Sequence, residues 1–219
     1  MDLISIIQQL RIAKKKADHI VMIFHAGDEH FQNPRPNLVK LYRFLIDEGA
    51  TIIVNHHQHC INGYEEYNGG LIFYGLGNFC FDKINKRNSP WNKGYFVELD
   101  FSEKTFSYTI HPYIQCDVKP LVRRLTSIET EDFNNEIHYL NSIIKDPIAL
   151  KNKYDQWINE NKDRYKSYLS PYSSKYIRFL VRKKLLPSFI KGIHSRILYL
   201  MISCESHRES IIKILEKIK

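Results

Sequence analysis

Two stretches of the sequence decide the fold, Ile20-Val21-Met22-Ile23-Phe24-His25-Ala26-Gly27-Asp28-Glu29 and Thr51-Ile52-Ile53-Val54-Asn55-His56-His57-Gln58-His59. Each begins with a short apolar run that is rich in β-branched residues and ends in polar residues. Such runs are typical of buried strands in a parallel sheet. Between them, apolar residues recur at helical spacing from Leu38 to Ile46, and Gly49 gives a helix stop signal. Strand, helix and strand in this order predict one right-handed crossover of an α/β sheet.

Further elements are expected on both sides of this unit. Residues 3–17 have the spacing of a helix, and the Asn68-Gly69-Gly70 turn predicts a hairpin. The strands of that hairpin are 64–67 and 71–74, and a second hairpin is expected from 95–101 and 105–113. From Ile128 onward the pattern is helical, with segments at 129–144, 147–162, 172–186, 188–203 and 206–218. We therefore expect an α/β region over residues 1–120 and an all-helical tail over 121–219.

The composition is that of a globular chain with an uneven charge. The chain has 219 residues, 43% of them hydrophobic and 13% aromatic, which argues against disorder. Residues 1–144 carry 15 basic and 17 acidic side chains, whereas residues 145–219 carry 17 basic and 7 acidic ones. The net charge of +8 therefore comes from the tail.

Cysteines and targeting signals give little information about the compartment. Cys60, Cys80, Cys116 and Cys204 lie far apart, with no zinc-finger spacing, and are expected to be free thiols. The N-terminus is acidic at Asp2, and we expect that it is not a signal peptide. The longest strongly apolar stretch without charge, 197–204, is much shorter than the roughly 20 residues of a membrane-spanning helix. A cytoplasmic or peripheral membrane location is expected.

Histidines follow both predicted strands. His25 ends the first run, and His56, His57 and His59 follow the second. Since the carboxyl ends of neighbouring parallel strands face one crevice, these imidazoles are expected to converge. Neutral imidazole suits Zn, Fe, Mn or Ni, and clusters of this kind are typical of metal-assisted hydrolysis. The alternative is that each histidine is an ordinary polar residue at a strand end.

The motifs around these histidines resemble the bacterial capsule synthesis protein family CapA. These poly-γ-glutamate capsule proteins belong to the calcineurin-like metallophosphoesterase superfamily. The family pattern runs H-W-G-x-E, L-I-D-x-G-A-D, G-x-H-P-H and S-L-G-N-F. Its counterparts here extend over about residues 4–112 and are His25-Ala26-Gly27-Asp28-Glu29, Leu45-Ile46-Asp47-Glu48-Gly49-Ala50, Asn55-His56-His57-Gln58-His59 and Gly75-Leu76-Gly77-Asn78-Phe79.

The resemblance implies a site that binds a divalent metal of the Mn, Fe or Zn class. The matching positions make His25, His57 and His59 the metal ligands, with His56 at a variable position. Glu29 and Asn78 become candidate catalytic residues, the first for substrate or outer-sphere contact and the second for shaping the wall of the cleft. The departures include Ala26 for Trp, Asn55 for Gly, Gln58 for Pro and Gly75 for Ser.

The resemblance also implies that part of the site is missing. The superfamily's early Asp motif, its bridging Gly-Asp and its Gly-Asn-His element do not occur before His25. We therefore expect half of a metallophosphoesterase-like β-sandwich flanked by helices, the C-terminal half of a truncated CapA-like protein. Such a half would pair with a chain that supplies the N-terminal half, or would self-associate through uncovered strand edges. The alternative is a non-catalytic remnant or scaffold.

The basic tail, residues 145–219, leaves three interpretations open. Its cations alternate with apolar residues from Tyr176 to Met201, as in helices that lie on an anionic membrane surface. The same charge could bind a polyanion. The plainest interpretation is a helical bundle with solvated cations. No RRM, helix-turn-helix or zinc-finger pattern supports specific nucleic-acid binding.

Overall fold

The computed structural model describes residues 2–168, 174–187, 190–204 and 207. The chain divides into two compact units, residues 1–156 and 157–219. The candidate site lies in the first unit.

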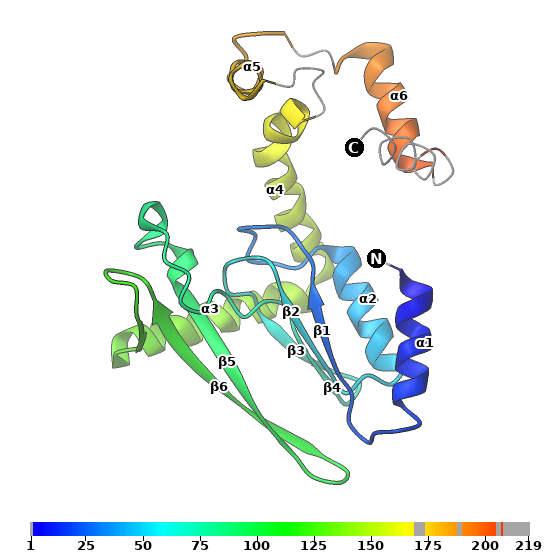
Figure 1. Cartoon of the computed structure of the whole chain (residues 1–219), viewed down its shortest axis with the longest axis vertical. Coiled ribbons are helices and arrows are strands. Elements are labelled where there is room, and N and C mark those ends of the chain that lie inside the picture. The colour runs from blue at the N-terminus through cyan, green and yellow to red at the C-terminus, as the bar shows by residue number, and fades with distance from the viewer. Residues whose placement is uncertain (1, 169–173, 188–189, 205–206, 208–219) are drawn as a thin grey trace. The chain divides into compact units, whose positions relative to one another are not determined.

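The first unit is built on a four-stranded sheet with the strand order β1-β2-β4-β3 (Figure 1). β1, β2 and β4 run parallel, and β3 is antiparallel to β4, as the predicted crossover and first hairpin require. The elements up to this point are α1 (Leu3–Ala13), β1 (Val21–His25), α2 (Pro36–Asp47), β2 (Ile52–His56), β3 (Tyr64–Tyr67) and β4 (Gly70–Phe73).

A second sheet follows, with the antiparallel order β5-β6-β7. Its long hairpin confirms the second predicted hairpin, whereas the three-residue β7 was too short to give a sequence signal. The elements are the 3-10 helices η1 (Ile84–Lys86) and η2 (Pro90–Asn92), followed by β5 (Lys93–Phe101), β6 (Phe106–Gln115) and β7 (Val122–Arg124).

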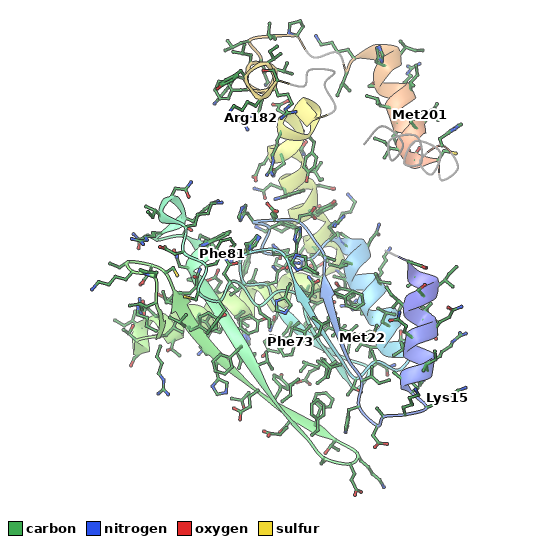
Figure 2. The ribbon with its side chains drawn as sticks, viewed as in Figure 1. Lys15, Met22, Phe73, Phe81, Arg182 and Met201 are labelled. Atoms are coloured by element: carbon green, nitrogen blue, oxygen red, sulfur yellow. The ribbon has the colours of Figure 1, made fainter. Side chains whose placement is uncertain are left out.

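The first sheet has a hydrophobic core on each face. α1 and α2 cover one face, where Tyr42 and Leu45 pack against Ile53 and Ile72. On the other face, Phe73 packs with Tyr95 of β5 and with Leu140 of the following helix. Figure 2 shows Phe73 on the side of the sheet that faces the β5–β6 hairpin. The fold is thus the predicted α/β class, a partial sandwich flanked by helices, with further helices at the C-terminus.

One strip of the first sheet remains uncovered. Among the described residues, β1 pairs only with β2, so it lies at the edge of the sheet. Ile23 of β1 is 73% exposed and Val21 is 39% exposed, although of their partners in β2, Ile52 is buried and Val54 packs against the core. An unpaired strand edge with exposed apolar side chains is a surface on which another strand can pair.

The helices α3 (Ser127–Lys145) and α4 (Pro147–Tyr168) follow the sheets. Thr126 and Glu129 form a capping box at the start of α3. The sequence predicts a boundary at residues 120/121, whereas the compact units divide at 156/157. The reason is that α3 contributes Phe133 and Leu140 to the core of the first unit.

The second unit contains the end of α4 together with α5 (Lys175–Arg182) and α6 (Gly192–Ser203). α5 and α6 are shorter than the predicted segments 172–186 and 188–203. The helix predicted over 206–218 lies outside the described residues, except for His207. Within the described residues, no helix is both long enough and apolar enough to cross a membrane.

Candidate functional site

The carboxyl ends of β1 and β2 bring the first two histidines together. His25 and His56 are register partners at the ends of these parallel strands, and His57 follows directly. The Nε2 atom of His25 lies 3.1 Å from the Nδ1 atom of His57, within hydrogen-bond distance. Two imidazoles that are distant in the sequence therefore share one point above the sheet.

The loop after β2 has an unusual backbone. His57 and His59 have φ angles of 112° and 58°, and His30 in the facing loop has 62°. Residues with a side chain seldom adopt positive φ, although histidine does so more often than most. Two cross-loop hydrogen bonds hold this conformation, from the His30 amide to the Gln58 carbonyl (2.7 Å) and from the Ala26 amide to the His56 carbonyl (3.1 Å).

Asn78 determines the orientation of His59. The Asn78 side-chain amide donates to the carbonyls of His59 (3.1 Å) and Trp91 (3.3 Å), which can only accept. Its Oδ1 atom therefore faces the Nδ1 atom of His59, 2.8 Å away. The proton of a neutral His59 ring must then reside on Nδ1, and Nε2 keeps a free lone pair. An outer partner that fixes the tautomer in this way is typical of metal-binding histidines.

Asn55 joins the ends of three strands beneath the histidines and is fully buried. Its Nδ2 donates to the carbonyls of Ala26 (2.9 Å) and Tyr74 (3.0 Å). Its Oδ1 accepts from the Ala26 amide (3.2 Å) and from the hydroxyl of Tyr42 in α2 (2.9 Å). The sequence indicated Asn55 only as a departure from the family's Gly, so its function in holding the loops was not foreseen.

Gln58 and Gly27 fit against each other in the same region. The Gln58 side-chain amide donates to the Ala26 carbonyl at 3.0 Å. Gly27 has a φ of 119°, and a Cβ atom there would lie 2.4 Å from Nε2 of Gln58. Any side chain at position 27 would therefore displace Gln58 and strain the backbone.

Aromatic side chains form one wall of the site. The ring of Trp91 stacks on His59, with centroids 4.8 Å apart, and also contacts His30 and Phe81. The ammonium group of Lys83 lies over the Trp91 ring, 5.4 Å from its centroid. Figure 2 labels Phe81 on the segment that leads from β4 to β5.

The two carboxylates of the first loop have different surroundings. Asp28 is largely buried, and its Oδ2 lies 3.0 Å from Nε of Arg35 without the alignment of a hydrogen bond. Burial raises the pKa of Asp28, against the opposing charges of Arg35 and His57. Glu29 is exposed. Burial lowers the pKa of the neighbouring His30, and the charge of Glu29 opposes this effect by raising it.

The chemistry of these groups fits a divalent cation in part. The 3.1 Å between the His25 and His57 nitrogens is close to the about 3.3 Å that separates two nitrogens on one tetrahedral zinc ion. The free Nε2 of His59 is a further donor, but the His57 and His59 rings are 6.3 Å apart. Across the described parts of the chain, no three His, Cys, Asp or Glu side chains are already grouped closely enough to hold a metal ion.

The structure thus pairs four of the five predicted site residues. His25 contacts His57, and His59 contacts Asn78. Glu29 lies on the facing loop, exposed to solvent, and its assignment as a catalytic residue stays a prediction. Burial and the charge of His25 lower the pKa of His56, which is the unassigned histidine of the loop.

The histidine loops lie in the part of the chain that matches a known protein family. Residues 1–83 match the family described as bacterial capsule synthesis protein PGA_cap. This segment of the chain is therefore similar to that family. The match ends before β5, whereas the motif resemblance extends over about residues 4–112.

Among the curated relatives of this chain are capsule biosynthesis proteins. The chain is 48% identical over 71 residues to the PGA biosynthesis protein CapA of Bacillus subtilis. These residues are 32% of this chain and 19% of that protein. The chain is 43% identical over 70 residues to the capsule biosynthesis protein CapA of Bacillus anthracis, covering 32% and 17%. An uncharacterised protein of Sinorhizobium fredii is 35% identical over 85 residues, covering 38% and 18%. The matched segment thus spans less than a fifth of these relatives.

Proposed function

We propose that this protein acts in the synthesis of a capsule or poly-γ-glutamate polymer, and that His25, His57 and His59 bind a divalent cation of the Mn, Fe or Zn class. The metal proposal is supported by the way in which the structure orients these three imidazole rings. His25 and His57 meet at 3.1 Å, and Asn78 leaves Nε2 of His59 free. The names of the relatives, PGA biosynthesis protein and capsule biosynthesis protein, support the proposed function in polymer synthesis.

The side chains of this chain would prepare such a site in specific ways. Asn55 donates hydrogen bonds to the carbonyls of Ala26 and Tyr74 and so holds the ends of three strands in place. We expect this to keep His25 and His57 together. Asn78 fixes the tautomer of His59, and Trp91 supports its ring. A bound cation would supply Lewis-acid polarisation of a phosphoryl or carbonyl oxygen and would lower the pKa of bound water.

We further propose that hydrolysis by a two-metal site needs a bridging carboxylate from outside the described residues, which a chain paired with this one could supply. Two cations about 3.5–4 Å apart require a bridging ligand. In this chain the nearby Asp28 is engaged with Arg35. The exposed edge of β1, with Val21 and Ile23, is the surface on which we propose that such a chain pairs.

Removal of His57 is expected to weaken Mn²⁺ binding by at least about 100-fold, because the loss of a ligand exceeds the about 10–100-fold effect of losing an outer partner. Asn78→Ala is expected to fall within that 10–100-fold range, since it only frees the tautomer of His59. Isothermal titration of the purified chain with MnCl2, repeated with ZnCl2, measures both effects.

His138→Ala is the matched control, because this histidine is exposed on α3, away from the loops of the site. It should bind Mn²⁺ as the unmodified chain does. If His57→Ala and His138→Ala bind equally well, the ligand assignment is wrong. If the unmodified chain binds no Mn²⁺ or Zn²⁺ while it is folded by circular dichroism, the histidines do not form a metal site in this chain alone.

The second unit favours a second candidate function, contact with an anionic membrane surface through the tail. Lys175 lies over the ring of Tyr176, and Arg182 lies over Phe179, so cations and exposed aromatic rings share α5. In α6, Ile193 is 71% exposed. We propose that these side chains bind anionic lipid, as basic amphipathic helices do.

Cosedimentation with vesicles measures this contact. The chain is expected to bind vesicles that contain phosphatidylserine and to be released by high salt, because each cation contributes about 1 kcal/mol near an anionic surface. Vesicles of phosphatidylcholine alone are the control. Equal binding to both kinds of vesicle would contradict the electrostatic proposal. Binding to soluble polyglutamate but not to anionic vesicles would favour a polyanion instead.

A further inference from the structure

Two cysteines lie together beside the candidate site, although 36 positions separate them in the sequence. Cys80 is exposed, directly after the Asn78-Phe79 segment, and Cys116 is buried at the end of β6. Burial raises the pKa of Cys116, and both the charge of Cys80 and the side-chain hydrogen bond between the two thiols act in the same direction. The two thiols are therefore close enough to interact.

Hydrogen bonds fasten the backbones around these two residues to each other. The amide of Phe81 donates to Oε1 of Gln115 (2.8 Å), so the neighbours of the two cysteines are joined directly. The side chain of Asn92 donates to the Cys116 carbonyl (2.9 Å). Arg87, which forms an ion pair with Asp82, donates to the Val118 carbonyl (2.7 Å). The segment after β4 and the segment after β6 thus form one packed unit.

We propose that Cys80 and Cys116 are a redox modification site that forms a reversible disulfide with a small disulfide such as oxidised glutathione as the oxidant. The Cys80 thiolate attacks one sulfur of glutathione disulfide, which forms a mixed disulfide and releases one glutathione thiolate. The Cys116 thiolate then attacks the sulfur of Cys80, and the second glutathione leaves. Two protein thiols are oxidised and one small disulfide is reduced to two thiols, so the two electrons and two protons balance.

The exposures of the thiols assign these roles. Cys80 is accessible to a small disulfide from solvent, whereas Cys116 is fully buried and can react only with a neighbour. Cys60 is also buried, and its thiol is engaged with the Gln58 carbonyl at 3.4 Å. Burial, and to a smaller extent Glu136, raises the pKa of Cys60 to about 12, which keeps it a thiol.

The two cysteines lie close to the candidate site, so a disulfide between them would affect that site. Asn78, which orients His59, lies two residues before Cys80, and its carbonyl accepts from Tyr113 of β6 at 3.1 Å. A disulfide would add a covalent link between the same two segments. The modification would therefore fasten the wall of the candidate site to the second sheet.

The test treats the full chain, reduced and then desalted, with oxidised glutathione and measures the intact mass in the absence of reductant. All variants carry Cys204→Ser, so that the cysteine of the second unit does not contribute. The expected product has lost two hydrogen atoms, retains no glutathione and returns to the starting mass with dithiothreitol. Peptide fragmentation should place the bond between Cys80 and Cys116.

Two further variants separate the proposed steps. Cys116→Ser should stop at the mixed disulfide and retain one glutathione on Cys80, because the second thiol is gone. Cys80→Ser should show neither change. Cys60→Ser is the matched control and should form the same disulfide as the parent. No reaction of the parent, a glutathione that persists on it, or a bond to Cys60 would each overturn the proposal.

Discussion

Replacing Glu65 by alanine is expected to lower the free energy of unfolding by about 3–5 kcal/mol, because it removes the buried partner of an ion pair and also the acceptor of a buried hydroxyl. Glu65 is only 4% exposed in β3. Its carboxylate accepts two hydrogen bonds from Arg43 of α2 (3.0 and 2.6 Å) and one from the hydroxyl of Tyr74 (2.6 Å). Alanine would leave both of these groups without their partner.

Urea denaturation of the purified variant measures this change. Glu65→Gln should be less damaging than alanine, since it keeps an acceptor for Arg43 or Tyr74. Glu66→Ala is the matched control, because Glu66 is the exposed neighbour on the same strand and accepts one hydrogen bond, from Tyr108. It should cost less than about 1.5 kcal/mol. Equal losses for Glu65→Ala and Glu66→Ala would show that the buried pair contributes little to stability.

Asn55→Ala is expected to have the second largest effect, a loss of about 2–4 kcal/mol in stability. The Tyr42 hydroxyl and the Tyr74 carbonyl would each lose the partner described above, at about 1–3 kcal/mol for each buried group. The loops after β1 and β2 would also lose their common anchor. The affinity for Mn²⁺ should therefore fall even at a temperature where the variant is folded.

Denaturation and Mn²⁺ titration of the same sample distinguish the two consequences. Asn135→Ala, on the exposed surface of α3, is the matched control and should change stability by less than about 0.5 kcal/mol. A variant at position 55 that is as stable as this control would mean that water replaces the lost hydrogen bonds. A destabilised variant with unchanged affinity would mean that Asn55 supports the fold and not the site.

Most of the first sheet could be predicted from the sequence because its signals are local. The runs 20–24 and 51–54 are continuous and β-branched, and Asn68-Gly69-Gly70 marks the first hairpin directly. The packing of α3 onto β3 could not be predicted, since its periodicity shows a buried face but not the surface that the face covers. The boundary between the units depends on that contact, and so it moved from 120/121 to 156/157.

The candidate site could be predicted only at the level of strand ends. That His25 and His57 would lie together followed from the parallel order of β1 and β2, and the structure confirms it. The link between Asn78 and His59 depends on the path of the loop after β4, which no short-range pattern encodes. Asn55 and Trp91 were missed for the same reason, because their importance lies in contacts across three segments.

Because the edge of β1 is unpaired in the described part of the chain, the melting temperature of this chain is expected to depend on what binds there. Anything that binds the strip around Ile23 in the folded state and not in the unfolded chain stabilises the fold by mass action. A partner at about a hundred times its dissociation constant would add about 2.7 kcal/mol. The melting temperature is then not a fixed property of the chain but a readout of what occupies β1 and at what concentration.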